Sequence, residues 1–130
     1  MAIPVTAALA AFCGLLLVGL ASRVSRLRFG LKIPFGDGGN PSLMRAIRTH
    51  GNTAEHAPIF LLLALCWELA RGSTAFLVAL AVLFAASRLA FALGVLGRGM
   101  HLWRMVGAAG TYVAQLLLAL GLALVALRVV

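Results

Sequence analysis

Four polar residues in the second quarter of the chain have the spacing of one helical face. Arg45, Arg48, Asn52 and Glu55 are separated by three, four and three positions. At roughly 100° per residue this spacing confines their side chains to one stripe, whereas His50 falls well off it. Chance rarely groups polar side chains in this way. The pattern therefore predicts a functional polar face, with His50 as a packing or interfacial residue rather than a general base.

A further arginine, Arg104, stands where the sequence predicts the start of the last helix. The first turn of a helix carries unpaired backbone N–H groups and the positive end of the helix dipole, and both favour an anion. Arg104 is therefore a candidate anion-binding residue. Its structural alternative is an interfacial arginine whose charged head extends to the aqueous phase.

Glu55 and Arg88 are ionisable residues inside otherwise apolar helices, where a charge is costly unless it has a partner. Glu55 precedes Ala70 by the same number of positions as Arg88 follows Ser73. On an antiparallel hairpin both are then roughly 22 Å from the shared turn. This predicts an ion pair between Glu55 and Arg88, which either fixes the register of the two helices or contributes to a ligand site.

The elements that must position these residues are helices in a membrane. With 63% hydrophobic and only 11% charged residues in 130, the chain has more apolar surface than a soluble domain of this size can bury. Asn40 and Pro41 read as an N-cap followed by the first helical residue. We expect an all-α, integral membrane four-helix bundle forming one domain over residues 1–130, embedded in the lipid bilayer, with helices at about 2–22, 41–70, 73–97 and 104–128.

The positive charges are distributed unevenly along the chain. Most of the eleven Lys and Arg residues lie between the first and second helices or between the third and fourth: Arg23, Arg26, Arg28, Lys32, Arg45, Arg48, Arg98 and Arg104. Arg71 and Arg128 lie on the other side. The positive-inside rule then places both termini outside the cytoplasm. Because these charges follow the first apolar run, that run reads as an uncleaved helix rather than a signal peptide.

The net charge of +8 raises the question of nucleic acid. The sequence has no zinc-ligand spacing and no soluble domain to carry a recognition surface, so we expect neither a nucleic-acid partner nor a metal site.

Two stretches of the sequence resemble the bacterial branch of the MAPEG family, the membrane-associated proteins in eicosanoid and glutathione metabolism. The first is Asp37-Gly38-Gly39-Asn40-Pro41. The second begins with Arg45 and continues through Arg48-Thr49-His50-Gly51-Asn52-Thr53-Ala54-Glu55-His56-Ala57-Pro58. The resemblance continues through Arg88 to Arg104-Met105-Val106-Gly107 and Thr111, so it covers essentially the whole chain. It implies a homotrimer in the bacterial inner membrane.

The resemblance also implies a ligand and a reaction. Family members bind glutathione as a co-substrate at subunit interfaces near the cytosolic side. By resemblance, the binding residues here are Arg48, Asn52 and Glu55, with Arg23 or Arg26 joining from a neighbouring subunit, and Arg104 is the catalytic residue beside the thiol. A cation near sulfur favours the thiolate, which would attack a small lipophilic electrophile or reduce a hydroperoxide.

Some positions depart from the better known eukaryotic members. Gly51, Phe91, Val95 and Ala108 stand where those members carry further arginine, histidine and tyrosine contacts, and Met105 replaces the serine of prostaglandin-synthase-like members. Two hypotheses follow: a glutathione-dependent membrane transferase or peroxidase with a generic detoxifying role, and a noncatalytic membrane scaffold or accessory subunit. A transporter or channel would need discontinuous helices or a polar pore lining, which the first and last helices lack.

Overall fold

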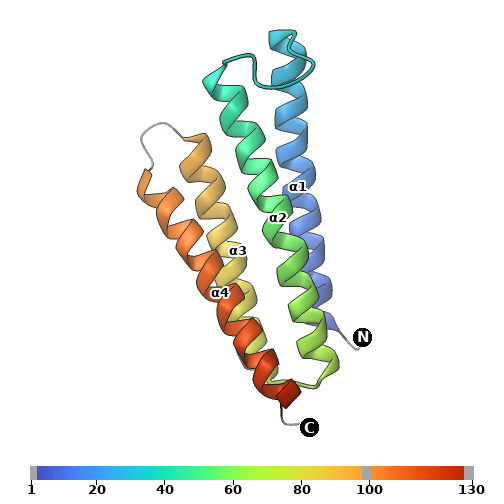
Figure 1. Cartoon of the computed structure of the whole chain (residues 1–130). Helices are drawn as coiled ribbons and strands as arrows, with labels where there is room; N and C mark the ends of the chain where they lie inside the picture. Colours follow the sequence, from blue (N-terminus) through green and yellow to red (C-terminus); the bar gives the residue numbers. More distant parts are fainter. Residues whose placement is uncertain (1–2, 98–100, 128–130) are drawn as a thin grey trace.

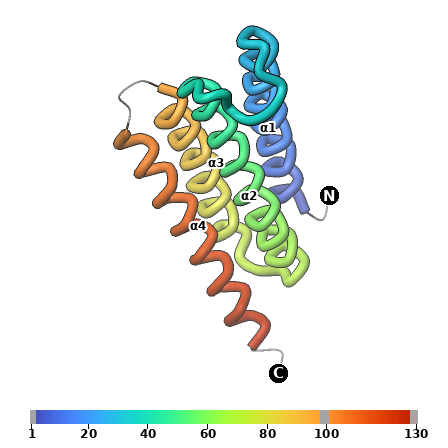
Figure 2. The backbone as a smooth tube through the Cα atoms, turned by 45° about the horizontal axis from the view of Figure 1, so that its top comes forward, coloured from blue at the N-terminus to red at the C-terminus, as the bar shows by residue number. Residues whose placement is uncertain are grey.

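The computed structural model describes residues 3–97 and 101–127 of the chain. They form four long helices joined in an antiparallel bundle (Figure 1): α1 (Pro4–Leu31), α2 (Pro41–Leu69), α3 (Thr74–Leu96) and α4 (His101–Leu127). α2 packs against the other three helices, and α4 packs against α3 and α2. α1 begins and α4 ends at the same end of the bundle (Figure 2). The predicted all-α four-helix architecture is confirmed.

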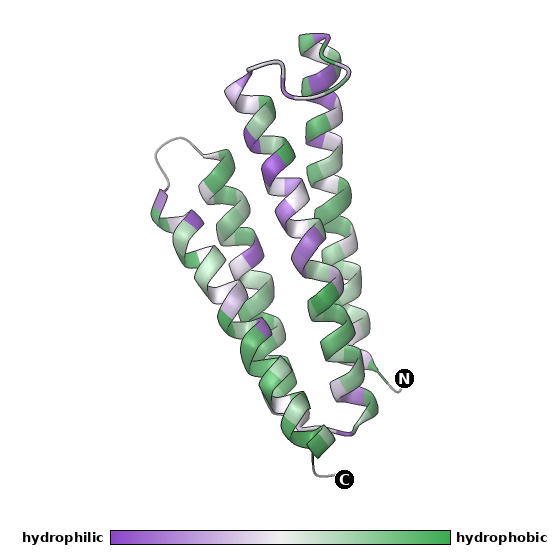
Figure 3. Ribbon diagram, in the orientation of Figure 1, coloured by the Kyte–Doolittle hydropathy of each residue, from purple (hydrophilic) through white to green (hydrophobic). Residues whose placement is uncertain are grey.

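The helices also confirm an integral, multi-pass membrane protein. α1, α3 and α4 are each long and apolar enough to cross a bilayer. α2 has 29 residues, about 43 Å at 1.5 Å per residue, but its polar residues gather in the half that follows the α1–α2 connection (Figure 3). The bundle is therefore apolar along most of its length and polar beside that connection.

The first helix is longer than the sequence analysis predicts. It continues to Leu31 instead of ending near residue 22, and Lys32 then adopts the left-handed conformation with φ 57°. Arg and Leu are good helix formers, so the charged run continues the helix instead of opening a loop. The guanidinium of Arg28 folds the chain back by donating to three carbonyl oxygens, those of Ile33, Pro34 and Gly36.

Residues 98–100 and 128–130 lie outside the described part of the chain. The predicted turn between the third and fourth helices falls partly there, as do Arg98 and Arg128 and the expected end of the last helix. α4 begins at His101, three residues earlier than predicted, so Arg104 still belongs to its first turn.

Three described side chains accept hydrogen bonds at helix N-termini: Asn40, Glu68 and Ser73, whose Oγ accepts from the N–H of Phe76 in α3. The Asn40 side chain accepts hydrogen bonds from the backbone N–H groups of Ser42 and Leu43, at 3.0 and 3.1 Å, which confirms the predicted cap of α2. α1 is capped from another helix, because the Glu68 carboxylate near the end of α2 accepts from the N–H groups of Val5 and Thr6. This contact ties the first turn of α1 to the last turn of α2.

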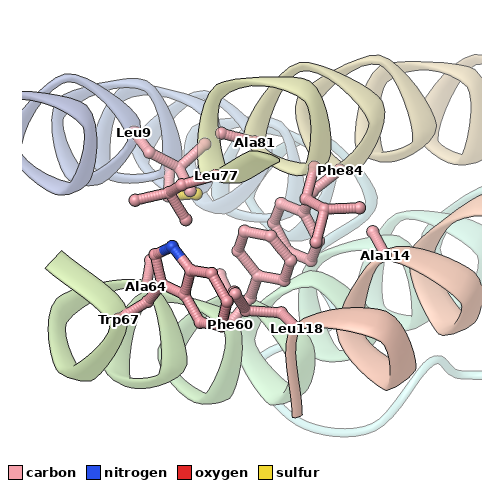
Figure 4. Packing of buried hydrophobic residues seen from close by; sticks show 12 residues of the cluster. Leu9, Phe60, Ala64, Trp67, Leu77, Ala81, Phe84, Ala114 and Leu118 are labelled. Atoms are coloured by element: carbon pink, nitrogen blue, oxygen red, sulfur yellow. The ribbon is translucent and has the colours of Figure 1, made fainter. Parts of the chain in front are cut away.

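The apolar core occupies the half of the bundle away from the polar end. The rings of Phe60 and Phe84 stack with centroids 4.1 Å apart, and the Trp67 indole lies beyond them (Figure 4). Leu77, Leu118 and several alanines fill the space between the helices, which suits the close packing of membrane helices.

α3 and α4 meet through glycines. A Cβ at Gly107 would meet the backbone N of Phe91, and one at Gly94 would meet the backbone of Arg104. The missing side chains let the two helix backbones touch, and this contact carries the start of α4, with Arg104, against α3.

We expect Gly107→Ala to lower the free energy of unfolding by about 1–3 kcal/mol, because the added methyl group must push α4 off the backbone of α3. Gly14→Ala is the matched control, since a Cβ there meets nothing within 4 Å. In α1 this change should raise stability by about 0.5–1 kcal/mol through helix propensity. The measurement is unfolding by sodium dodecyl sulfate in mixed micelles, and equal effects of the two substitutions would contradict the close contact.

Candidate functional site

A hollow of about 480 Å3 lies at the polar end of the bundle, between α2, α3 and α4. It is lined by Met44, Arg45, Arg48 and Asn52 of α2, Phe91 and Val95 of α3, and Arg104, Met105, Ala108 and Tyr112 of α4. Three of the four stripe residues therefore face Arg104 across one cavity. The sequence placed these residues on separate helices, and the tertiary structure brings them together.

The hollow is strongly basic. Arg48 and Arg104 are exposed and Arg45 is half-buried, so their guanidinium groups remain available to a ligand. Among the described residues that line the hollow none is acidic. Three cations that line one hollow repel one another, and an anionic ligand would relieve that repulsion.

Behind this hollow, Arg88 is buried, with 1% of its surface exposed. Its Nε donates to Thr111 Oγ1 at 3.0 Å, and its Nη1 donates to Asn52 Oδ1 at 2.8 Å. The guanidinium carbon also lies 4.9 Å from the centroid of the Phe91 ring, within cation–π range. One side chain of α3 thus holds α2 and α4 and fixes the Asn52 amide at the edge of the hollow.

The expected ion pair between Glu55 and Arg88 is not formed within the described chain. Arg88 bonds to Asn52 and Thr111 instead, and Glu55 is exposed. Equal distance from the shared turn fixes depth along the helix axis but not direction around it. Glu55 is displaced by about 60° around α2 from Asn52, and its side chain is exposed while the Asn52 amide bonds Arg88.

Other candidate residues lie apart from the hollow. Arg23 and Arg26 are exposed on α1, and the Arg26 Nε bonds its own helix at the Ser22 carbonyl, 3.4 Å away. Neither lines the cavity that Arg104 enters. Glu55 lies outside that lining too.

Gly51, Phe91, Val95 and Ala108 are the positions where, by resemblance, eukaryotic members carry arginine, histidine or tyrosine contacts, and three of these four line the hollow. Phe91, Val95 and Ala108 line the hollow and give it an apolar wall, whereas a Cβ at Gly51 would meet open space. Tyr112 also lines the hollow and was not predicted from the sequence. Its spacing of eight residues from Arg104, with Ala108 midway, puts it near the same face of α4 and could have indicated it.

Comparison with known proteins identifies the family. The model of the MAPEG family matches residues 6–124. The chain belongs to the MAPEG family. This confirms the resemblance drawn from the sequence, and the match includes every residue of the hollow.

Two curated relatives of the chain are proteins of Escherichia coli. The chain is 35% identical over 116 residues to the inner membrane protein YecN of Escherichia coli K12, which covers 89% of this chain and 88% of that protein. The same protein from an Escherichia coli O6:H1 strain matches equally. Its name describes a membrane location, in agreement with the membrane-spanning helices found here.

We expect Thr111→Val to lower the free energy of unfolding by about 1–3 kcal/mol, because it leaves the buried Arg88 Nε without an acceptor while preserving shape. Thr53→Val is the matched control. Both hydroxyls are buried and donate to the carbonyl four residues earlier, but Thr53 does so to Thr49 within its own helix, at 2.9 Å. Detergent unfolding curves of the two variants should therefore separate. Similar curves would show that Arg88 does not depend on Thr111.

Proposed function

We propose that the protein is a glutathione-dependent membrane transferase or peroxidase acting on lipophilic electrophiles or hydroperoxides. The observation that carries this proposal is the convergence of Arg45, Arg48 and Arg104, from two helices, on one hollow at the polar end of a MAPEG bundle. A water-soluble anionic co-substrate can reach this end, and a membrane-dissolved substrate can reach the helices below it.

The polar groups of the hollow suit glutathione. Glutathione has two carboxylates, and guanidinium groups bind carboxylates with paired, charge-assisted hydrogen bonds. Arg45 and Arg48 supply such groups from successive turns of α2. Asn52 adds an amide whose oxygen is already bound to Arg88, leaving its NH2 group as a donor to the peptide carbonyls of the ligand.

Arg104 is the proposed catalytic residue. A free thiol has a pKa of about 8.5, so only a few per cent is ionised at neutral pH. A guanidinium at the first turn of α4, assisted by the positive end of that helix, would stabilise the thiolate and raise the fraction of nucleophile several-fold. The thiolate would then attack an electrophilic carbon or the O–O bond of a hydroperoxide.

We also propose a homotrimer in the bacterial inner membrane, with both termini outside the cytoplasm. Arg23, Arg26 and Glu55 do not reach the hollow of their own chain, so a neighbouring subunit is needed for them to take part in binding. The basic residues near the α1–α2 connection support the orientation, since such residues favour the cytoplasmic side.

One observation favours a noncatalytic scaffold or accessory subunit as the second candidate. Phe91, Val95 and Ala108 give the hollow an apolar wall, at positions where by resemblance the eukaryotic members of the family carry polar contacts. If the remaining arginines do not hold glutathione, the polar groups serve the stability of the bundle alone.

We expect glutathione added to the protein at neutral pH to give a saturable near-ultraviolet difference absorbance from its thiolate, and Arg104→Ala to abolish this signal. Arg71→Ala is the matched control, because Arg71 is exposed in the connection at the opposite end of the bundle. Heats of binding measured on the same samples separate loss of ionisation from loss of binding. If the parent protein gives neither a thiolate absorbance nor a heat of glutathione binding, the result favours the scaffold.

The trimer predicts a particle mass of three chains of 13.6 kDa after removal of detergent in native mass spectrometry. It also predicts that Arg26→Ala weakens glutathione binding although Arg26 does not line the hollow of its own chain. A monomeric particle that binds glutathione with unchanged affinity after this substitution would overturn the shared site.

A further inference from the structure

A second hollow, of about 410 Å3, lies between α2 and α4, further from the polar end. Its walls combine apolar and polar side chains: Ile59, Leu63, Leu116 and Ala119 with His56, Tyr112 and Gln115. Tyr112 lines both this hollow and the arginine-lined one. The two spaces therefore meet at a single tyrosine, which lies eight residues, or about 12 Å, along α4 from Arg104.

The polar residues of the second hollow form a cluster near the middle of the membrane helices. His56 lies close to the midpoint of α2, and Gln115 lies close to the midpoint of α4. The His56 Nδ1 and the Gln115 Oε1 are 3.1 Å apart, and the rings of His56 and Tyr112 meet with centroids at 5.4 Å. The cluster joins the two helices across the hollow.

Polar side chains at this depth are costly in a bilayer, and their presence points to a function. The pair leaves hydrogen-bonding capacity unused. In the histidine tautomer that donates from Nδ1 to the Gln115 Oε1, the Gln115 NH2 group keeps its donors and the His56 Nε2 remains an acceptor. The Tyr112 hydroxyl, on an exposed side chain, is a further donor.

We propose that Gln115, held by His56, and Tyr112 bind the carbonyl group of the lipophilic substrate, and that the preferred substrates are quinones and related α,β-unsaturated ketones. This inference rests on the proposed function and narrows its substrate class. Two side chains that carry donors line one hollow, which suits a carbonyl oxygen, and the apolar walls suit a flat ring. A simple alkyl halide would leave these donors unpaired, which costs affinity.

The arrangement accounts for the chemistry of conjugate addition. The thiolate sulfur forms a bond to the carbon β to the carbonyl, and the π electrons of the C=C bond move to the carbonyl oxygen. That oxygen becomes an enolate held by the Gln115 and Tyr112 donors. The enolate then takes up one proton, which balances the proton that the thiol lost on ionisation. The donors therefore lie where negative charge develops. No further oxidant or reductant is needed.

The test uses two probes in nanodiscs that contain the full chain, without glutathione. Menadione carries a quinone, and 2-methylnaphthalene has the same ring skeleton and methyl group without the carbonyls. The affinity for menadione comes from its saturable quenching of protein fluorescence, and the affinity for 2-methylnaphthalene comes from its competition with menadione. Partition of each probe into protein-free nanodiscs is subtracted. We expect the parent protein to prefer menadione about tenfold, the value of roughly one hydrogen bond.

Gln115→Leu combined with Tyr112→Phe should remove this preference while leaving the affinity for 2-methylnaphthalene unchanged, and that retained binding shows that the variant is folded. Thr53→Val, a buried polar residue of α2 outside both hollows, should keep the preference. Equal affinities of the parent for both probes, or a preference that survives the paired substitution, would overturn the proposal. Because glutathione is absent, a failed thiolate measurement leaves this result unaffected, and the reverse also holds.

Discussion

The bonds of one buried guanidinium organise the polar half of this bundle. Arg88 on α3 donates to Asn52 on α2 and to Thr111 on α4, so three helices share a single charge. A charge inside a membrane bundle is tolerated when its donors are satisfied, and removing a partner leaves the cost of burial uncompensated. Small changes in helix register would break these bonds. Arg88 thereby fixes the heights at which α2 and α4 present their side chains to the hollow beside it.

Glycine contacts between α3 and α4 complement this polar clamp. Where Arg88 bonds through its side chain, Gly94 and Gly107 let the two helix backbones touch. Membrane helices gain little from the hydrophobic effect on associating, because lipid is as apolar as their side chains, so close packing and interhelical hydrogen bonds carry the association. The same two features hold Arg104 and Asn52 at one basic cavity.

The bundle divides into two chemical environments along its length. The apolar half contains the stacked rings of Phe60 and Phe84, and the polar half contains the cavity lined by three arginines. A protein that joins a water-soluble thiol to a membrane-dissolved substrate needs both environments next to each other. The cluster of His56, Tyr112 and Gln115 lies along the α2–α4 cleft, where its cavity meets the arginine-lined one at Tyr112.

The sequence by itself determined the four-helix membrane architecture, the cap at Asn40 and the helical stripe that includes Arg45, Arg48 and Asn52, because hydropathy, capping and helical periodicity are local properties. It did not determine which face of each helix turns toward a neighbouring helix. Glu55 and Arg88 stand at similar depth, yet Asn52 faces Arg88 and Glu55 turns away. The length of α1 and the bond from Glu68 to its first turn were also missed. Those outcomes depend on how each helix is rotated against its neighbours, and only tertiary packing decides that.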